Sequence, residues 1–174
     1  MKLGGPKPVD DRNLVERVLR GDTEAFNLLI LQWEKPIYNF IFRLIGDREE
    51  AMDLCQESFM KAYRELATLK DRDRFSAWLY RIAHNTCYSR LRKDIGKTFV
   101  ELQPDTSSHR SAVEIGLAVE KALKQLPEEQ REAVVLKVFH ELKFEEIAQI
   151  QGAPVSTVKS RLYMAFEKLR SILG

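Results

Sequence analysis

A helical pattern interrupted by one glycine, over residues 144–169 (FEEIAQIQGAPVSTVKSRLYMAFEKL), constrains this chain more than any other feature. Ile147 and Ala148 share one face of a short predicted helix, Gly152 ends it, and a second helix follows. A small side chain, a flexible turn and the branched Val158 suit two helices that cross at a steep angle. The expected apolar stripe of the second helix comprises Val155, Val158, Leu162, Phe166 and Leu169. The pattern predicts a helix-turn-helix.

The other face of this second helix carries polar groups that can bond base edges and phosphates in a major groove. These residues are Ser156, Thr157, Lys159, Ser160, Arg161 and Tyr163. The alternative is an amphipathic hairpin with an ordinary solvated face. The spacing of Ala148, Gly152 and Val158 beside a basic second helix favours DNA binding.

Composition indicates a folded globular protein, because 44% of its 174 residues are hydrophobic and 31% are charged. The net charge of +2 does not by itself point to nucleic acid. Two cysteines, Cys55 and Cys87, are too few for a disulfide framework and favour a reducing compartment. The start, MKLGGPKPVDD, has no apolar core, and no apolar run suggests a membrane span. We therefore expect a cytoplasmic protein that is not inserted in a membrane.

Helical periodicity predicts four helices in the first half, where Asp10 or Asp11 and Asp22 or Thr23 can cap the first two. A kink or break is expected at Pro36. The third helix covers about residues 49–66 and the fourth about 75–92, with a polar loop at 68–74. The expected inward residues of the first and third helices are Leu14, Val15, Val18, Leu19, Met52, Cys55, Phe59, Ala62 and Tyr63.

The composition then changes to a stretch rich in Gly, Pro, Ser and Thr, and helical periodicity resumes near Val113. We predict an all-α fold of two small domains, at residues 9–93 and 113–173, joined by a flexible linker at 94–112. The second domain contains the helix-turn-helix.

Two sequence blocks, one in each predicted domain, resemble those of a known protein family. The second domain reads LPEEQREAVVLKVFHELKFEEIAQIQGAPVSTVKSRL, and the first contains DREEAMDLCQESFMKAYREL followed by FSAWLYRIAHNTCYSRLRK. In this order, and with a linker between them, they resemble the two domains of bacterial RNA polymerase sigma factors of the extracytoplasmic-function group, in the sigma-70 family. The resemblance covers nearly the whole chain.

The resemblance implies that the third helix docks on the polymerase. Asp53, Gln56 and Glu57 repeat the DLxQExF pattern of the family, and this face would contact the coiled coil of the polymerase clamp. The polymerase flap and an anti-sigma protein are further implied partners. Without the motif, scattered carboxylates indicate only a solvated acidic face.

The resemblance also implies that the fourth helix and the loop before it hold the melted minus-ten strand, where cations follow phosphates and rings stack on bases. A flipped base would enter a polar pocket there, and Asn85 offers both a donor and an acceptor. Trp78 is expected in the core, and Tyr88 is left open. The implied minus-ten residues are Leu69, Lys70, Tyr80, Arg81, Asn85 and Ser89.

In the helix-turn-helix, Lys159, Ser160 and Tyr163 match positions that face the minus-thirty-five element in the family. The backbone amides of Ser156 and Thr157 can bind phosphate, whereas Arg161 can bind phosphate or brace the helix. The chain departs from the common pattern at Met164 and Phe166, where many members have a basic residue. Its recognition sequence is therefore expected to differ from that of its relatives.

No cofactor, metal site or enzyme activity is expected. His84 and Cys87 have the spacing of a ligand pair, but no second pair complements them, and His109 and His140 have no matching cysteine nearby. The alternative functions are a stand-alone helix-turn-helix regulator, which would need a dimerisation element, and a helical adaptor that binds protein. Salt-insensitive binding would distinguish the adaptor.

Overall fold

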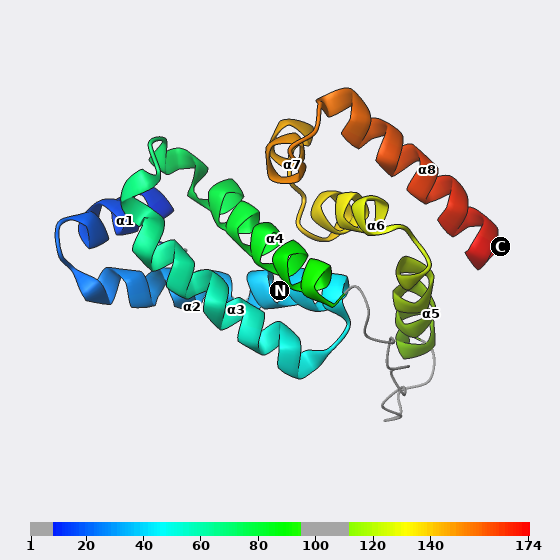
Figure 1. Ribbon diagram of the computed structural model, residues 1–174, viewed down its shortest axis with the longest axis horizontal. Helices are drawn as coiled ribbons and strands as arrows, with labels where there is room; N and C mark the ends of the chain where they lie inside the picture. The colour runs from blue at the N-terminus through cyan, green and yellow to red at the C-terminus, as the bar shows by residue number, and fades with distance from the viewer. Residues whose placement is uncertain (1–8, 95–111) are drawn as a thin grey trace, which may run out of the picture.

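A computed structural model describes residues 9–94 and 112–174, and all regular structure within these ranges is helical (Figure 1). The predicted linker lies almost wholly outside the described residues, so its flexibility stays a prediction. The α-helices are α1 (Asp11–Leu19), α2 (Thr23–Ile45), α3 (Arg48–Glu65), α4 (Phe75–Lys93), α5 (Ala112–Lys124), α6 (Glu128–Val134), α7 (Phe144–Gln151) and α8 (Val155–Leu173). Three single turns complete the list: η1 (Leu66–Thr68), η2 (Arg72–Arg74) and the π-helical η3 (Val135–Phe139).

Aspartate side chains begin the first three helices, because each accepts a backbone N–H that has no partner within the helix. Asp10 caps α1, Asp22 caps α2 and Asp47 caps α3. The break expected at Pro36 does not occur, since α2 continues across it from Thr23 to Ile45. Burial on both sides of Pro36, at Leu29 and Ile37, holds the helix together despite the lost hydrogen bond.

The inward face of α3 differs from the predicted one. Met52 and Tyr63 are 55% and 49% exposed, so their assignment to the core was wrong. The buried row of α3 consists of Ala51, Leu54, Cys55, Ser58, Phe59 and Ala62. This row is continuous because α3 packs between α2 and α4, which together select one face of the helix. In α1, Leu19 is likewise exposed, whereas Leu14 and Val15 are fully buried.

The second half contains the predicted helix-turn-helix. Gly152 ends α7 in the left-handed region at φ 60°, which favours glycine, and Val158 of α8 is fully buried against α7. One member of the expected stripe was wrong: Phe166 is 45% exposed, and the neighbouring Ala165 is buried instead. The short side chain of Ala165 allows α8 to approach α6 closely.

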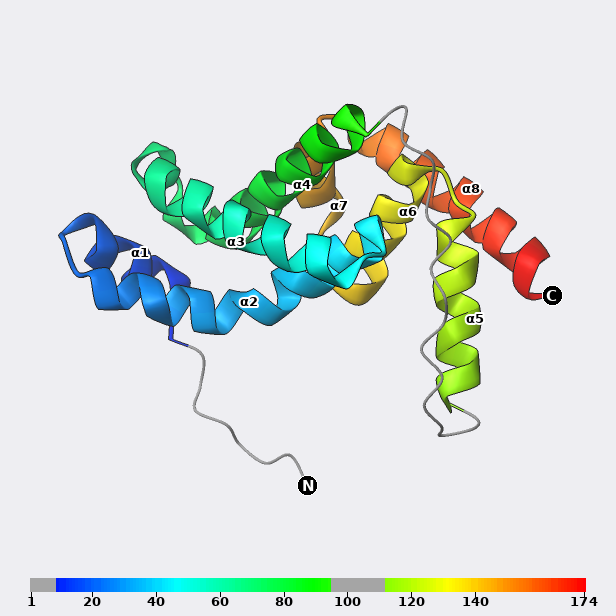
Figure 2. The same cartoon turned by 60° about the horizontal axis from the view of Figure 1, so that its bottom comes forward.

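The two helical groups pack against each other. Helix α4 of the first group contacts α7 of the second, and both views place them side by side (Figures 1 and 2). One apolar core runs through this boundary, from Phe40 and Leu79 to Leu136 and Ile147. None of the described helices combines the length and apolar character needed to cross a bilayer. The two domains therefore share one apolar core in this arrangement.

Candidate protein and nucleic-acid interfaces

The predicted recognition face of α8 is open to solvent. Ser156, Lys159 and Ser160 are exposed, Thr157 is half-buried, and Tyr163 is 68% exposed. Pro154 precedes the first residue of α8, and its backbone oxygen accepts from the N–H of Thr157 at 3.0 Å. The N–H of Ser156, one position earlier, has no acceptor within the helix and is oriented for an anion. The ammonium of Lys159 lies 5.3 Å from the ring centre of Phe144, so a cation–π contact holds it beside the first residue of α7.

Arg161 braces the helix-turn-helix from within. Its Nη2 donates to Oε2 of Glu129 at 2.7 Å, and its Nη1 donates to Oε1 of Gln151 at 3.0 Å. Its side chain is only 16% exposed. Of the two roles left open by the sequence, these contacts favour bracing, and phosphate binding by Arg161 stays a prediction.

The two apolar departures from the family pattern both face solvent. Met164 is 49% exposed and Phe166 is 45% exposed, next to the exposed Tyr163. Neither side chain can donate to a base edge or a phosphate. The surface beyond Lys159 thus offers van der Waals contact and no charge at these two positions.

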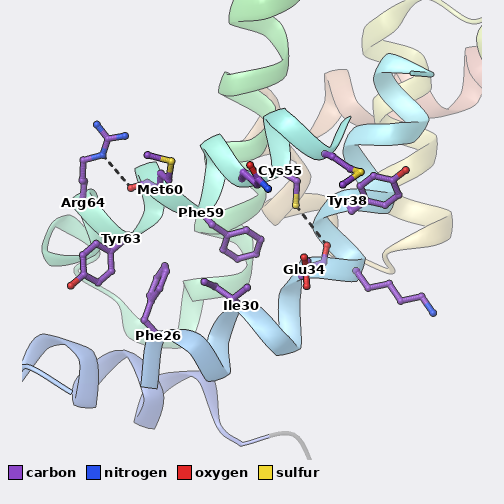
Figure 3. Close-up of a pocket in the computed structure, with 12 residues that line it drawn as sticks. Phe26, Ile30, Glu34, Tyr38, Cys55, Phe59, Met60, Tyr63 and Arg64 are labelled. Atoms are coloured by element: carbon purple, nitrogen blue, oxygen red, sulfur yellow. Dashed lines mark hydrogen bonds between the residues drawn. The ribbon is translucent and has the colours of Figure 1, made fainter. Parts of the chain in front are cut away.

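The predicted polymerase-binding residues share the outer face of α3. Asp53, Gln56 and Glu57 are all exposed, and Glu57 pairs with Lys61 on the next turn at 2.7 Å. Gln56 also lines an apolar groove of about 780 Å³ between α2 and α3. Figure 3 shows how this groove continues past Phe26, Ile30, Phe59, Met60 and Tyr63. The exposed Met52 and Tyr63 also line this groove.

A polar cleft between α3 and α4 joins two predicted sites. Asp53 and Glu57 of the polymerase-binding face lie in the same cleft as Ser89 of the minus-ten set. Arg90 crosses the cleft and donates to Oε1 of Glu50 at 2.8 Å. The structure therefore brings residues of the two sites together, although Ser89 lies more than thirty positions after Asp53 and Glu57 in the chain.

The predicted minus-ten residues divide into an exposed set and a buried pair. Lys70, Arg81, Asn85 and Ser89 are exposed. Leu69 and Tyr80 are only 7% and 3% exposed and belong to the core, so in this arrangement neither can touch a base. Trp78 packs against Phe75, in agreement with the expected core position.

Tyr80 is covered by the second domain. Its hydroxyl lies 2.9 Å from Nδ1 of His140, and the rings of Trp33 and Phe40 pack edge-to-face against it. Burial raises the pKa of Tyr80, so its hydroxyl stays protonated at neutral pH. Contact of Tyr80 with DNA stays a prediction, and it requires the second domain to move away.

The residues that connect the two domains were not predicted from the sequence. Glu132 of α6 is fully buried, and its carboxylate accepts from Nδ1 of His84 at 2.5 Å and from Nε2 of Gln151 at 2.9 Å. Tyr88 stacks on His84 at 4.3 Å between ring centres, and its hydroxyl lies 3.5 Å from Glu132. One feature of the sequence pointed to Glu132: it directly precedes the apolar run AVVL. A charged side chain beside buried positions needs a hydrogen-bonding or charged partner.

The described ranges contain no group of three or more histidine, cysteine, aspartate or glutamate side chains arranged to hold a metal ion. His84 bonds to Glu132 and His140 to Tyr80. His109 lies outside the described residues.

His140 makes stability depend on pH. Burial, followed by the charge of Arg43, lowers its pKa from 6.5 to about 4. The unfolded chain therefore binds more protons between about pH 6.5 and 4, and the contribution of neutral His140 is lost as the pH falls through that range. We expect the thermal midpoint to fall less steeply between pH 7.5 and 5 in His140→Gln than in the unmodified chain. Parallel curves would remove His140 as a source of the pH dependence.

Comparisons with known proteins agree with this geometry. Sigma-70 region 2 matches residues 29–94, and Sigma-70 region 4 matches residues 116–169. The chain is 38% identical to the RNA polymerase sigma-H factor of Pseudomonas aeruginosa, over 94% of this chain and 93% of that protein. It is 32% identical to the ECF RNA polymerase sigma-E factor of Haemophilus influenzae, over 92% and 94%.

Two solved structures share the fold. The sigma factor RpoE in complex with the anti-sigma factor NepR from Bartonella quintana matches with a TM-score of 0.75 and 28% identity, over 85% of this chain and 96% of that one. CnrH in complex with the cytosolic domain of CnrY matches with a TM-score of 0.74 and 26% identity, over 95% and 97%. Two family regions in order, relatives matched over almost their full length and a shared two-domain fold establish that this chain belongs to the extracytoplasmic-function group of sigma-70 RNA polymerase sigma factors.

Proposed function

We propose that this chain is a dissociable initiation subunit that binds core RNA polymerase, directs it to a specific set of promoters and helps to open the DNA. The observation that carries this proposal is the presence, in one chain, of an exposed helix-turn-helix and a second exposed face that matches the polymerase-binding motif. Sigma factors are initiation factors rather than enzymes, so the chain supplies surfaces and no catalytic groups.

The polymerase contact is assigned to α3. The exposed Asp53, Gln56 and Glu57 present carboxylate and amide oxygens to basic groups of the clamp coiled coil. The adjoining groove between α2 and α3 offers apolar area that an exposed acidic face alone would lack. The second domain contacts the polymerase flap.

Promoter recognition is divided between two helices. Lys159, Ser160 and Tyr163 of α8 read the duplex minus-thirty-five element, and the amides of Ser156 and Thr157 hold phosphate. Helix α4 captures the melted minus-ten strand through Arg81, Asn85 and Ser89, with Lys70 from the preceding loop. Leu69 and Tyr80 join this set once the helices around them are rearranged.

The site of action is the cytoplasm, where RNA polymerase works. RpoE and CnrH were solved in complex with the anti-sigma factor NepR and with the cytosolic domain of CnrY. By analogy, a protein that covers the polymerase-binding surfaces of one or both domains regulates this chain.

The proposal is tested by capturing purified core RNA polymerase with the chain and then adding both to run-off transcription on fragmented genomic DNA. Stable capture and new start sites are expected. If the chain does not bind core polymerase in the absence of other proteins, the proposal is wrong. Salt-sensitive DNA binding without polymerase would then indicate a stand-alone regulator, and salt-insensitive protein binding an adaptor.

Lys159→Ala is expected to lower affinity for promoters about 5- to 150-fold, because one base or phosphate contact contributes roughly 1–3 kcal/mol. Affinity for core polymerase is expected to remain unchanged, since α3 is untouched. The comparison is made by filter binding of holoenzyme to a promoter found by run-off transcription. Lys168→Ala, an exposed lysine in the last two turns of α8, serves as the matched control. Equal promoter affinity of Lys159→Ala and the unmodified chain would remove Lys159 from the site.

A further inference from the structure

We propose that Glu132 is the centre of a latch that holds the free chain in a closed, inactive arrangement of its two domains. The proposal rests on the proposed function and concerns its regulation. The latch is defined by three residues: His84 on α4, Glu132 on α6 and Gln151 on α7. Opening it releases α4 to receive the melted strand and allows the two domains to reach their separate DNA elements.

The latch is a continuous series of hydrogen bonds across the domain boundary. Because a carboxylate only accepts, Nδ1 of His84 carries the proton that it donates to Glu132. The other carboxylate oxygen accepts from Gln151, whose own oxygen accepts from Arg161 of α8. This series of hydrogen bonds therefore connects α4, which is proposed to capture the melted strand, with α8, which is proposed to read the duplex. The Glu132 carboxylate at its centre has no exposed surface.

The closed arrangement is incompatible with simultaneous recognition of both promoter elements. Elements at ten and thirty-five positions upstream are about 25 steps apart, which is about 85 Å of B-form DNA at roughly 3.4 Å per step. Helices in contact lie about 8–10 Å apart, and α4 contacts α7 directly while α7 contacts α8. The two recognition helices are thus separated by a single helix, α7, which corresponds to two interhelical distances or about 16–20 Å. The domains must part before both elements can be bound.

Other contacts stabilise the closed arrangement. Nη1 of Arg131 donates to the backbone oxygen of Leu44 at 3.1 Å, and the guanidinium of Arg43 lies 4.1 Å from the ring centre of Phe139. The interface also contains an imperfection, because Nε2 of His140 is buried without a hydrogen-bond partner among the described residues. This domain interface is stable in the free chain and can open when polymerase and DNA bind each domain separately.

Glu132 is the most sensitive point because its two carboxylate oxygens accept from His84 and from Gln151, and bonds to a charged acceptor are the strong ones. His84 belongs to the first domain and Glu132 to the second, so breaking the bond between them leaves the helices of each domain packed among themselves. Two variants test this: Glu132→Gln, which keeps the shape and removes the charge, and His84→Glu, which sets two carboxylates against each other. Glu128→Gln, one turn earlier on α6 and exposed, is the matched control.

The distance between domains is measured in the full chain by double electron–electron resonance, with spin labels on cysteines introduced at the exposed Glu65 and Lys168. The natural Cys55 and Cys87 are buried, and burial raises the pKa of Cys55 to about 11, so both react slowly with the label. A single short distance is expected for the unmodified chain and for Glu128→Gln. A broad distribution at longer distances is expected for Glu132→Gln and His84→Glu.

The functional consequence is measured as affinity for purified core polymerase and as the rate of open-complex formation. If the closed form holds 90–99% of the free chain, opening it raises apparent affinity about 10- to 100-fold. Unchanged distances in both variants overturn the latch. Longer distances with unchanged affinity and opening rate overturn its inhibitory role. If no form of the chain binds core polymerase, the proposed function is wrong and the inhibitory role falls with it, whereas longer distances still establish the latch.

Discussion

Replacing Asn85 with alanine is expected to slow promoter opening about 5- to 150-fold, because an amide that pairs with a base edge contributes roughly 1–3 kcal/mol of discrimination. Asn85 is exposed on α4 and offers both a donor and an acceptor, so it suits a base that has left the stack. The rate of open-complex formation on a mapped promoter is measured from the permanganate reactivity of unpaired thymines over time.

Core polymerase affinity is expected to stay unchanged in this variant, since Asn85 lies outside the α3 face. Asn13→Ala, the same substitution at an exposed position of α1, is the control and should open promoters at the normal rate. Loss of polymerase binding or unfolding in Asn85→Ala would assign Asn85 a structural role instead.

Replacing Phe40 with alanine is expected to destabilise the fold by about 3–5 kcal/mol, because the deletion leaves a cavity in the centre of the core. Phe40 is fully buried, and its ring lies 5.4 Å from that of Tyr80 and 6.0 Å from that of His140. The cavity therefore forms where the two domains meet. Urea unfolding followed by circular dichroism measures the loss.

Phe166→Ala provides a matched comparison for Phe40→Ala. The ring of Phe166 is 45% exposed, and exposed substitutions usually change stability by no more than about 0.5 kcal/mol. Equal losses in the two variants would mean that Phe166 is packed as the helical pattern first suggested. A small loss at Phe166 would leave this ring free for contacts with DNA or with another protein.

The local features were predictable because short-range rules determine them. Asp22 caps a helix by accepting an N–H three residues away, and Gly152 ends another because a glycine tolerates the left-handed region. The helix-turn-helix and the all-α fold follow from periodicity and such signals. The exposed candidates Asp53, Lys159 and Asn85 were found because a motif, rather than a tertiary contact, marks them.

Periodicity was insufficient where two adjacent residues compete for the same face of a helix. Met52 and Tyr63 were expected inside α3, and Phe166 inside α8, yet all three are exposed. A helical stripe is wide, and the position of the neighbouring helices decides which edge of it is buried. Ala165 is buried in place of the larger Phe166 because α8 approaches α6 closely there.

The sequence by itself therefore determined the helices, the helix-turn-helix and the motifs from which the polymerase-binding and DNA-binding faces are predicted, since each depends on residues a few positions apart. Only the tertiary structure decided that Tyr80 is hidden beneath His140, 60 positions away, and that Glu132 receives His84, 48 positions away. Such pairs leave no periodic signal, because the packing of whole helices brings them together. The exposure of Tyr80 on α4 is consequently a property of the domain arrangement.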